Sequence, residues 1–191
     1  TASNTYNTAV GSAAGNALTT GDENTLVGGQ AGDALTQGVR NTALGRVALS
    51  TDTLGQYSVA VGYAALFAQN QTTAVNTYNV AVGYNAGAAI TTGVDNVLVG
   101  GLTGDALTDA DVNIAIGTSA LSSDTLGSKS IAIGKGTLFT QNFTTATDSH
   151  NIAIGVNAGL SVTTGQFNTL VGGIAGDALT TGTRNVVVGY N

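Results

Sequence analysis

The chain has 191 residues, of which 42% are hydrophobic and 8% charged, and it contains 28 glycines but no proline, cysteine, methionine or tryptophan. This composition excludes a disordered chain, and the absence of cysteine excludes disulfides and thiolate sites. A formal charge of −6 with five basic residues argues against a nucleic-acid partner, and no apolar run approaches the roughly 20 residues of a membrane span.

One short box recurs along the whole sequence: asparagine or serine, three residues, then glycine. The spacing between successive glycines is 17 in three steps and 21 in the fourth, so three short coils and one long coil make a unit with a period of 72. Such a period is typical of a solenoid, in which stacked repeats bury one continuous core. The glycines that close the box are Gly11, Gly28, Gly45, Gly62, Gly83, Gly100, Gly117, Gly134, Gly155, Gly172 and Gly189.

The period predicts a single repeat array over residues 1–191, with units at about 12–83 and 84–155 and a partial unit at 156–191. The opening TASNTYNTAVG matches TAVNTYNVAVG, which occupies 73–83, the same place in the following unit. Because the chain begins and ends inside a unit, we expect it to be an excerpt from a longer array.

The three residues before each closing glycine are predicted to be a short strand, from residues 8–10 to residues 186–188 in chain order. Each triplet has a β-branched residue, then alanine, leucine or valine, then an aliphatic residue. Successive residues of a strand point to opposite faces, and here the residues on both faces are apolar, so the strand should be covered on both faces. We expect one face to fill the coil and the other to meet sister chains, with Ala60, Ala81 and Ala132 of the middle column at that interface.

The columns after the glycine indicate a packed core. Four positions after the box glycine, the first two coils of a unit carry glycine and the last two coils carry leucine. Seven positions after it, the first two coils carry an aliphatic residue and the last two coils carry a polar residue. Each coil thus keeps one large aliphatic side chain, as a close-packed interior requires. The prediction is an all-β parallel β-solenoid of about eleven stacked coils. A second turn is marked by Gly21, Gly38, Gly55, Gly93, Gly127, Gly165 and Gly182.

Several boxes resemble a known class of repeat. SVAVGYAAL at 58–66, NIAIGTSAL at 113–121 and SIAIGKGTL at 130–138 are similar to the head repeats of trimeric autotransporter adhesins, which also occur in tail-fibre-like proteins of bacteriophages, marine phages among them. The resemblance implies a left-handed parallel β-roll and a homotrimer, intertwined or side by side. It also implies a structural, non-enzymatic role without cofactor, as the shaft of a phage tail fibre in the virion.

Two alternatives to the phage fibre remain open. One is the head of a trimeric adhesin on a bacterial surface, and the other is a filament-forming structural protein. In each case the expected partners are copies of the chain itself and, for a fibre or adhesin, a polysaccharide or protein of the host surface.

Asp33, Asp105 and Asp177 raise the question of calcium, because GGQAGDALT and its two copies are similar to the nonapeptide that wraps calcium in some β-helices. That motif needs consecutive turns, whereas this box occurs once per unit. Asn16 and Ser50, in the neighbouring coils, add few charged oxygens. We therefore expect turn residues that accept local backbone N–H groups, with calcium as the minor alternative.

The box asparagines are predicted to stack into a hydrogen-bonded ladder, with carbohydrate recognition as the alternative. Threonine also stacks, but an ice-binding face needs a second threonine column on the same strand, and the column two residues earlier is mostly alanine. The ladder residues are Asn7, Asn24, Asn41, Asn79, Asn96, Asn113, Asn151, Asn168 and Asn185.

The long coils carry the candidate binding surface. Their additional residues fall in 69–79 and 141–151, and insertions in a solenoid form loops on one side, often the binding side. A solvated bulge without function is the alternative. His150 is the single histidine, and equivalent positions of other coils hold acidic, basic or aromatic residues, so His150 gives little support to a catalytic role. The candidate receptor contacts are Asn70, Gln71, Tyr78, Asn142, Phe143 and His150.

Overall fold

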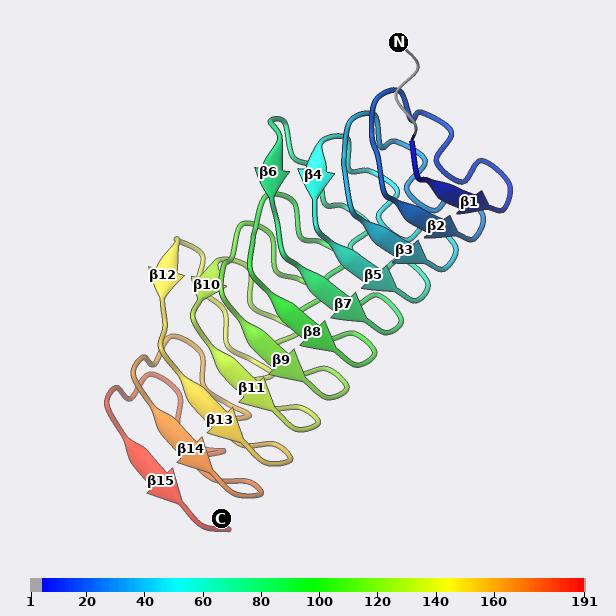
Figure 1. The fold of residues 1–191 in the computed structure, drawn as a ribbon. Coiled ribbons are helices and arrows are strands. Elements are labelled where there is room, and N and C mark those ends of the chain that lie inside the picture. The colour runs from blue at the N-terminus through cyan, green and yellow to red at the C-terminus, as the bar shows by residue number, and fades with distance from the viewer. Residues whose placement is uncertain (1–4, 191) are drawn as a thin grey trace.

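The computed structural model describes residues 5–190, which wind into a parallel β-solenoid of eleven coils (Figure 1). Every coil adds one strand to an 11-stranded sheet, and residues of the same column lie opposite each other, as Ala60 does to Ala81. The predicted fold and the predicted length of its coils are confirmed. Residues 5–190 contain no helix long and apolar enough to cross a membrane. The strands are β1 (Thr8–Val10), β2 (Thr25–Val27), β3 (Thr42–Leu44), β5 (Val59–Val61), β7 (Val80–Val82), β8 (Val97–Val99), β9 (Ile114–Ile116), β11 (Ile131–Ile133), β13 (Ile152–Ile154), β14 (Thr169–Val171) and β15 (Val186–Val188).

Two short parallel pairs, which the repeat pattern did not predict, accompany the long coils. β4 (Gly55–Gln56) pairs with β6 (Val75–Asn76), and β10 (Gly127–Ser128) pairs with β12 (Thr147–Asp148). Figure 1 shows both pairs on the side of the stack where the chain enters the main sheet. The additional residues of each long coil therefore form a bulge with backbone pairing of its own.

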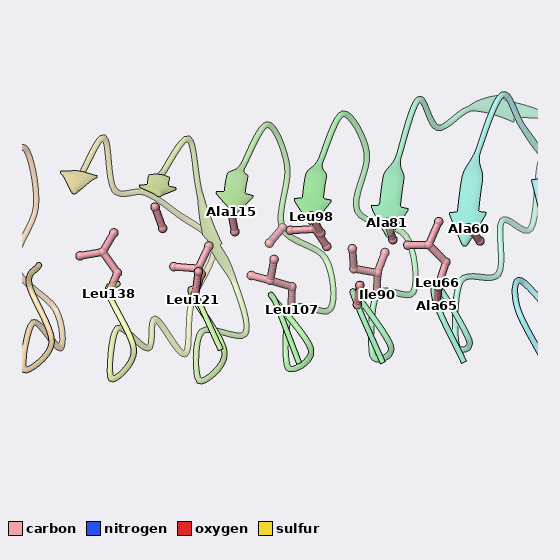
Figure 2. Packing of buried hydrophobic residues seen from close by; sticks show 14 of the residues in the cluster. Ala60, Ala65, Leu66, Ala81, Ile90, Leu98, Leu107, Ala115, Leu121 and Leu138 are labelled. Carbon is pink, nitrogen blue, oxygen red and sulfur yellow. The ribbon is translucent and has the colours of Figure 1, made fainter. Parts of the chain in front are cut away.

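The middle residue of each strand points into the coil, and this corrects one prediction. Ala60, Ala81 and Ala132 are fully buried within the single chain, so they cannot lie at an interface between chains. Figure 2 shows the middle column facing aliphatic side chains from the opposite wall of the coil, such as Leu107 and Leu121. The first and third strand residues face outward instead.

The glycines four positions after the box glycine make room for leucine in the core. The second coil of each unit has leucine in the middle of its strand: Leu26, Leu98 and Leu170. A Cβ on Gly15 or Gly32 would lie 2.8 Å from a methyl group of Leu26. Coils that have alanine in the middle of their own strand and of the following strand carry leucine at that place, for example Leu121 and Leu138. The alternation of glycine and leucine that the sequence shows at this position therefore reflects how side chains of adjacent coils pack together.

Candidate functional site

The main sheet presents an apolar outward face along its whole length. It consists of the first and third residues of every strand, mostly valine and isoleucine. Ile114, Ile116 and Ile154 are 37%, 38% and 38% exposed although strands flank them on both sides. Ten steps of about 4.8 Å between strands and about 10 Å of strand length make a strip of roughly 500 Å². Soluble monomers rarely expose apolar patches above a few hundred Å², so the outward face is a candidate interface.

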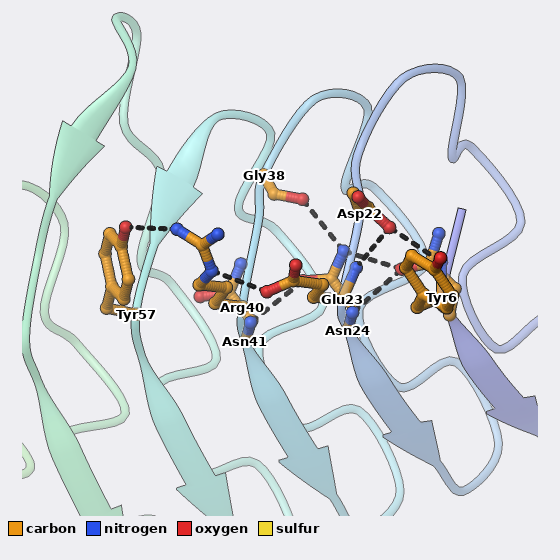
Figure 3. Close-up of polar contacts among 9 residues, drawn as sticks. Tyr6, Asp22, Glu23, Asn24, Gly38, Arg40, Asn41 and Tyr57 are labelled. Carbon is orange, nitrogen blue, oxygen red and sulfur yellow. Dashed lines mark hydrogen bonds and ion pairs between the residues drawn. The ribbon is translucent and has the colours of Figure 1, made fainter. Parts of the chain in front are cut away.

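A flanking column of charged and aromatic side chains runs beside the outward face. Arg40 donates to Glu23 over 2.6 Å and to the Tyr57 hydroxyl over 2.7 Å (Figure 3). These two partners raise the pKa of Arg40 above its ordinary value, Glu23 more strongly. Tyr57 stacks on Tyr78 with ring centres 5.3 Å apart. Ten members of the column have a positive φ of 48–63°: Glu23, Arg40, Tyr57, Tyr78, Asp95, Val112, Lys129, His150, Phe167 and Arg184.

The asparagine column forms a ladder through the coil interior. The Oδ1 of Asn24 accepts the backbone N–H of Asn41 at 2.9 Å, and its Nδ2 donates to the Gly38 carbonyl at 2.8 Å (Figure 3). Each side chain thus ties its own turn to the following coil. The threonine column is bonded in the same direction: the Thr19 hydroxyl donates to the Thr36 carbonyl at 3.0 Å. These amides and hydroxyls already have partners inside the protein.

A polar network replaces the ladder where serine stands in the asparagine column. Ser58 has no side-chain amide that could continue the ladder, and the buried side-chain amide of Gln69 takes the place of that amide. Gln69 Nε2 donates to Ser58 Oγ at 2.8 Å and to Asp52 Oδ2 at 2.6 Å, while its Oε1 accepts from Asn79 at 2.9 Å. Asp52 Oδ1 accepts the N–H groups of Gly55 and Gln71. The carboxylate of Asp52 is therefore fully buried but has three donors.

The second long coil repeats this network. Gln141 Nε2 donates to Asp124 at 2.6 Å and to Ser130 at 2.9 Å, and Asp124 also accepts the backbone N–H of Phe143. The residues that enter each bulge are therefore anchored in the core. Sequence reasoning placed Asp124 and Gln141 among the polar positions but did not identify their burial, since only the fold brings their partners together.

The structure separates the candidate receptor contacts into buried and exposed groups. Gln71 and Phe143 are 5% and 4% exposed, so a receptor cannot reach these side chains. Asn70 and Asn142 accept the hydroxyls of Thr53 and Thr125.

The other two candidates lie in the flanking column. Tyr78 is 51% exposed and stacks on Tyr57, and His150 stacks on Phe167 with ring centres 5.3 Å apart. The tips of the bulges are the exposed residues 72–74 and 144–146. The accessible part of each bulge is therefore its tip together with an aromatic side chain of the flanking column.

The aspartates of the glycine-rich box do not form the expected bonds at both oxygens. Asp33 Oδ1 and Asp105 Oδ1 are buried and have no hydrogen-bond partner within residues 5–190. Burial raises the pKa of Asp105. In the same described residues, His, Cys, Asp and Glu side chains do not gather in groups of three or more that could hold a metal ion. Asp33 and Asp105 lie in different units, so they cannot share one ion.

Comparison with known protein families, curated proteins and solved structures gives no match. The function has to be inferred from this geometry. The features that sequence reasoning missed are the direction of the outward face and the buried carboxylates of Asp52 and Asp124. The signal for the latter was the coincidence of aspartate in the third coil with glutamine in the fourth coil of both units.

Proposed function

We propose that the chain is a non-catalytic shaft segment of a fibre, in which three copies of a left-handed solenoid pack their outward faces around a common axis. The exposed apolar strip is the observation that carries this proposal. Stable interfaces bury about 800 Å² per partner, and the strip of roughly 500 Å² would supply more than half of that area. The number of chains, the winding and a place in a phage virion follow from the resemblance of SVAVGYAAL and similar boxes to adhesin and tail-fibre repeats.

The bulges are the proposed contacts with a host surface, either polysaccharide or protein. Their tips at 72–74 and 144–146 are exposed, and they lie four coils apart, about 19 Å along the stack. Equivalent weak contacts at this spacing add up on a polymeric receptor through effective concentration. The shaft then acts as a rigid spacer that carries repeated contact points. A trimeric adhesin head on a bacterial cell would use the same surfaces.

Charges on the outward face test the assembly. The double variant Ile114→Lys with Ile116→Lys places two cations per chain in β9, and we expect the trimer to dissociate into folded monomers. Sedimentation measures the mass, and circular dichroism checks the strands. A monomeric unmodified chain, or an unchanged mass for the variant, refutes packing through this face.

The middle residue of the same strand is the matched control. Ala115 is fully buried inside the coil, so Ala115→Asp should unfold the chain locally and lose β-structure, whereas the Ile variants should not. The two outcomes separate loss of assembly from loss of fold.

A further inference from the structure

Two surface hollows lie at equivalent places in successive units. The first notch, of about 320 Å³, is lined by Tyr63, Phe67, Tyr84 and Asn85, among others. The second notch, of about 250 Å³, is lined by Lys135, Phe139 and Asn157, which are the corresponding positions of the next unit. Both notches lie in the turns that follow the main strands, apart from the bulges. A hollow repeated at the period of the unit is a property of the fold.

Each notch has an aromatic wall with access to solvent. Phe67 and Phe139 are 43% and 38% exposed. In the first notch, Tyr63 and Tyr84 stack with ring centres 5.6 Å apart and 14° between their planes. The face of an aromatic ring is electron-rich, and it attracts the polarised C–H groups on the flat side of a sugar ring. Each volume suits about one sugar ring and is small for a larger ligand.

A cation without a carboxylate partner lies in the second notch, and another lies beside the first. Of the five basic residues, Arg40 pairs with Glu23 and Lys129 with Asp148. Within residues 5–190, Arg46 and Lys135 form no ion pair. Lys135 lines the second notch. Arg46 lies beside the first notch and not in its lining: its guanidinium is 5.8 Å from the ring centre of Tyr63, and it donates to the Tyr63 hydroxyl at 3.5 Å. In a chain with a formal charge of −6, a cation without a carboxylate partner in or beside each notch favours an anionic ligand.

Polar groups complete the lining. Asn85 and Asn157 occupy the same position in the two notches, and their side-chain amides make no hydrogen bond to the rest of residues 5–190. Each amide can therefore donate to and accept from the hydroxyls of a ligand. Ring face, amide and cation together match the three kinds of group on a carboxylated sugar.

We propose that the two notches are binding sites for acidic sugar residues of a carboxylated polysaccharide. The sugar ring packs on Phe67 or Phe139, its carboxylate faces Arg46 or Lys135, and its hydroxyls meet Asn85 or Asn157. Single sites of this size and exposure bind weakly, but they recur about 19 Å apart along the stack. This inference assigns a ligand class to a surface that the proposed function does not use, and it requires no particular number of chains.

Oligogalacturonates serve as the probe, with uncharged maltooligosaccharides of equal length for comparison. Calorimetric titration of the whole chain should show binding of the charged series and much weaker binding of the neutral one. The double variant Phe67→Ala with Phe139→Ala should weaken binding about tenfold. Arg46→Gln with Lys135→Gln should weaken binding of the charged sugars about threefold or more and remove the preference for them.

Arg184→Gln is the charge-matched control, because it removes an exposed cation of the flanking column that lines neither notch, and it should leave binding unchanged. An equal loss of affinity in Arg184→Gln and in Lys135→Gln means that net charge alone attracts the sugar, and it overturns the proposal. Absence of oligogalacturonate binding overturns it as well, and so does binding of polyglutamate in its place. Sedimentation of the same samples reports the assembly separately, so failure here leaves the shaft proposal standing and the reverse also holds.

Discussion

At the scale of single residues, the closing glycine of each coil meets two separate requirements. Its φ lies between 132° and 145° in all eleven coils, a region that residues with a side chain rarely adopt. A Cβ on Gly11 would also lie 2.5 Å from the carbonyl oxygen of Gly28 in the next coil. The column is therefore invariant because adjacent coils approach each other through it.

Replacement of one such glycine tests this account. A Cβ on Gly83 would lie 2.6 Å from the carbonyl carbon of Gly100, so Gly83→Ala should lower the free energy of unfolding by about 3 kcal/mol or more. A Cβ on Gly101 would meet no atom within 4 Å, and its φ is not left-handed, so Gly101→Ala should change stability by less than about 1 kcal/mol. Denaturant titration of both variants measures the difference; similar losses would contradict the steric explanation.

The carboxylate of Asp105 should make stability depend on pH. Burial raises its pKa above the ordinary value of 3.8, and one of its oxygens lacks a hydrogen-bond partner within the described residues. A raised pKa in the folded state means that stability is fully present below the unfolded-state pKa and falls as the pH rises through the folded-state pKa.

Asp105→Asn should therefore raise the melting temperature at pH 7 and have little effect near pH 3, where both side chains are neutral. Thermal unfolding at the two pH values gives the comparison. Asp109→Asn, at an exposed carboxylate of the same coil, is the control and should show no such difference. A gain of equal size at both pH values would mean that desolvation of the charge is not the cause.

At the scale of elements, each long coil is a bulge held by a buried network. Asp52 supplies the acceptor for the backbone N–H of Gln71, where the chain leaves the regular path, and Gln69 connects that carboxylate to Ser58 and Asn79. Buried charges persist only when hydrogen bonds satisfy them. The insertion and the network are therefore one structural feature, and it explains why polar residues replace aliphatic ones in the interior of these coils.

The tip of each bulge and the short strand that follows it, β6 or β12, should be dispensable for folding, whereas the buried anchor should not be. A single glycine in place of 72–76, and another in place of 144–148, shortens both long coils to the length of the short ones and keeps Gln71 and Phe143. We expect this variant to retain its circular dichroism spectrum and to melt within a few degrees of the unmodified chain. If the tips contact the receptor, the shortened variant should no longer attach to host cells.

Asp52→Asn is the contrasting change in the same coil. The new NH2 group of residue 52 would face the NH2 group of Gln69, so two donors would oppose each other. The Gln69 amide cannot rotate to avoid this without losing its hydrogen bond from Asn79, and the variant should therefore lower the free energy of unfolding by about 1–3 kcal/mol. Collapse of the trimmed variant, or full stability of Asp52→Asn, would reverse the assignment of tip and anchor.

At the scale of the whole molecule, the solenoid is a stack in which every strand contacts only its neighbours. The stability of such arrays is approximately the sum of the stabilities of the repeats and of the interfaces between neighbours. Here those interfaces consist of the parallel ladder, the asparagine and threonine columns and the aliphatic core. Eleven strands at about 4.8 Å make a rod roughly 50 Å long.

Excess chelator should therefore leave the melting temperature of the rod unchanged, since the contacts between coils are hydrogen bonds and apolar packing. Differential scanning calorimetry with and without chelator measures this. A large decrease that added calcium restores would assign Asp33, Asp105 and Asp177 to a metal site after all.

The sequence by itself determined the period, the eleven strands and the core. A constant spacing places the same kind of residue in the same column, and the eleven predicted triplets are the strands of the main sheet. Only the tertiary structure decided which face of the strand lies inside. Both faces are apolar, so alternation carries no information. In the folded chain, the coil interior takes the alanine of the middle column, such as Ala60, or leucine where glycine makes room for it, as Gly32 does for Leu26, and the residues on either side of the middle column face outward. Contacts between coils likewise decided the burial of Asp52, Gln71 and Phe143, because their partners lie in the adjacent coil and meet them only after the chain has wound once around the core.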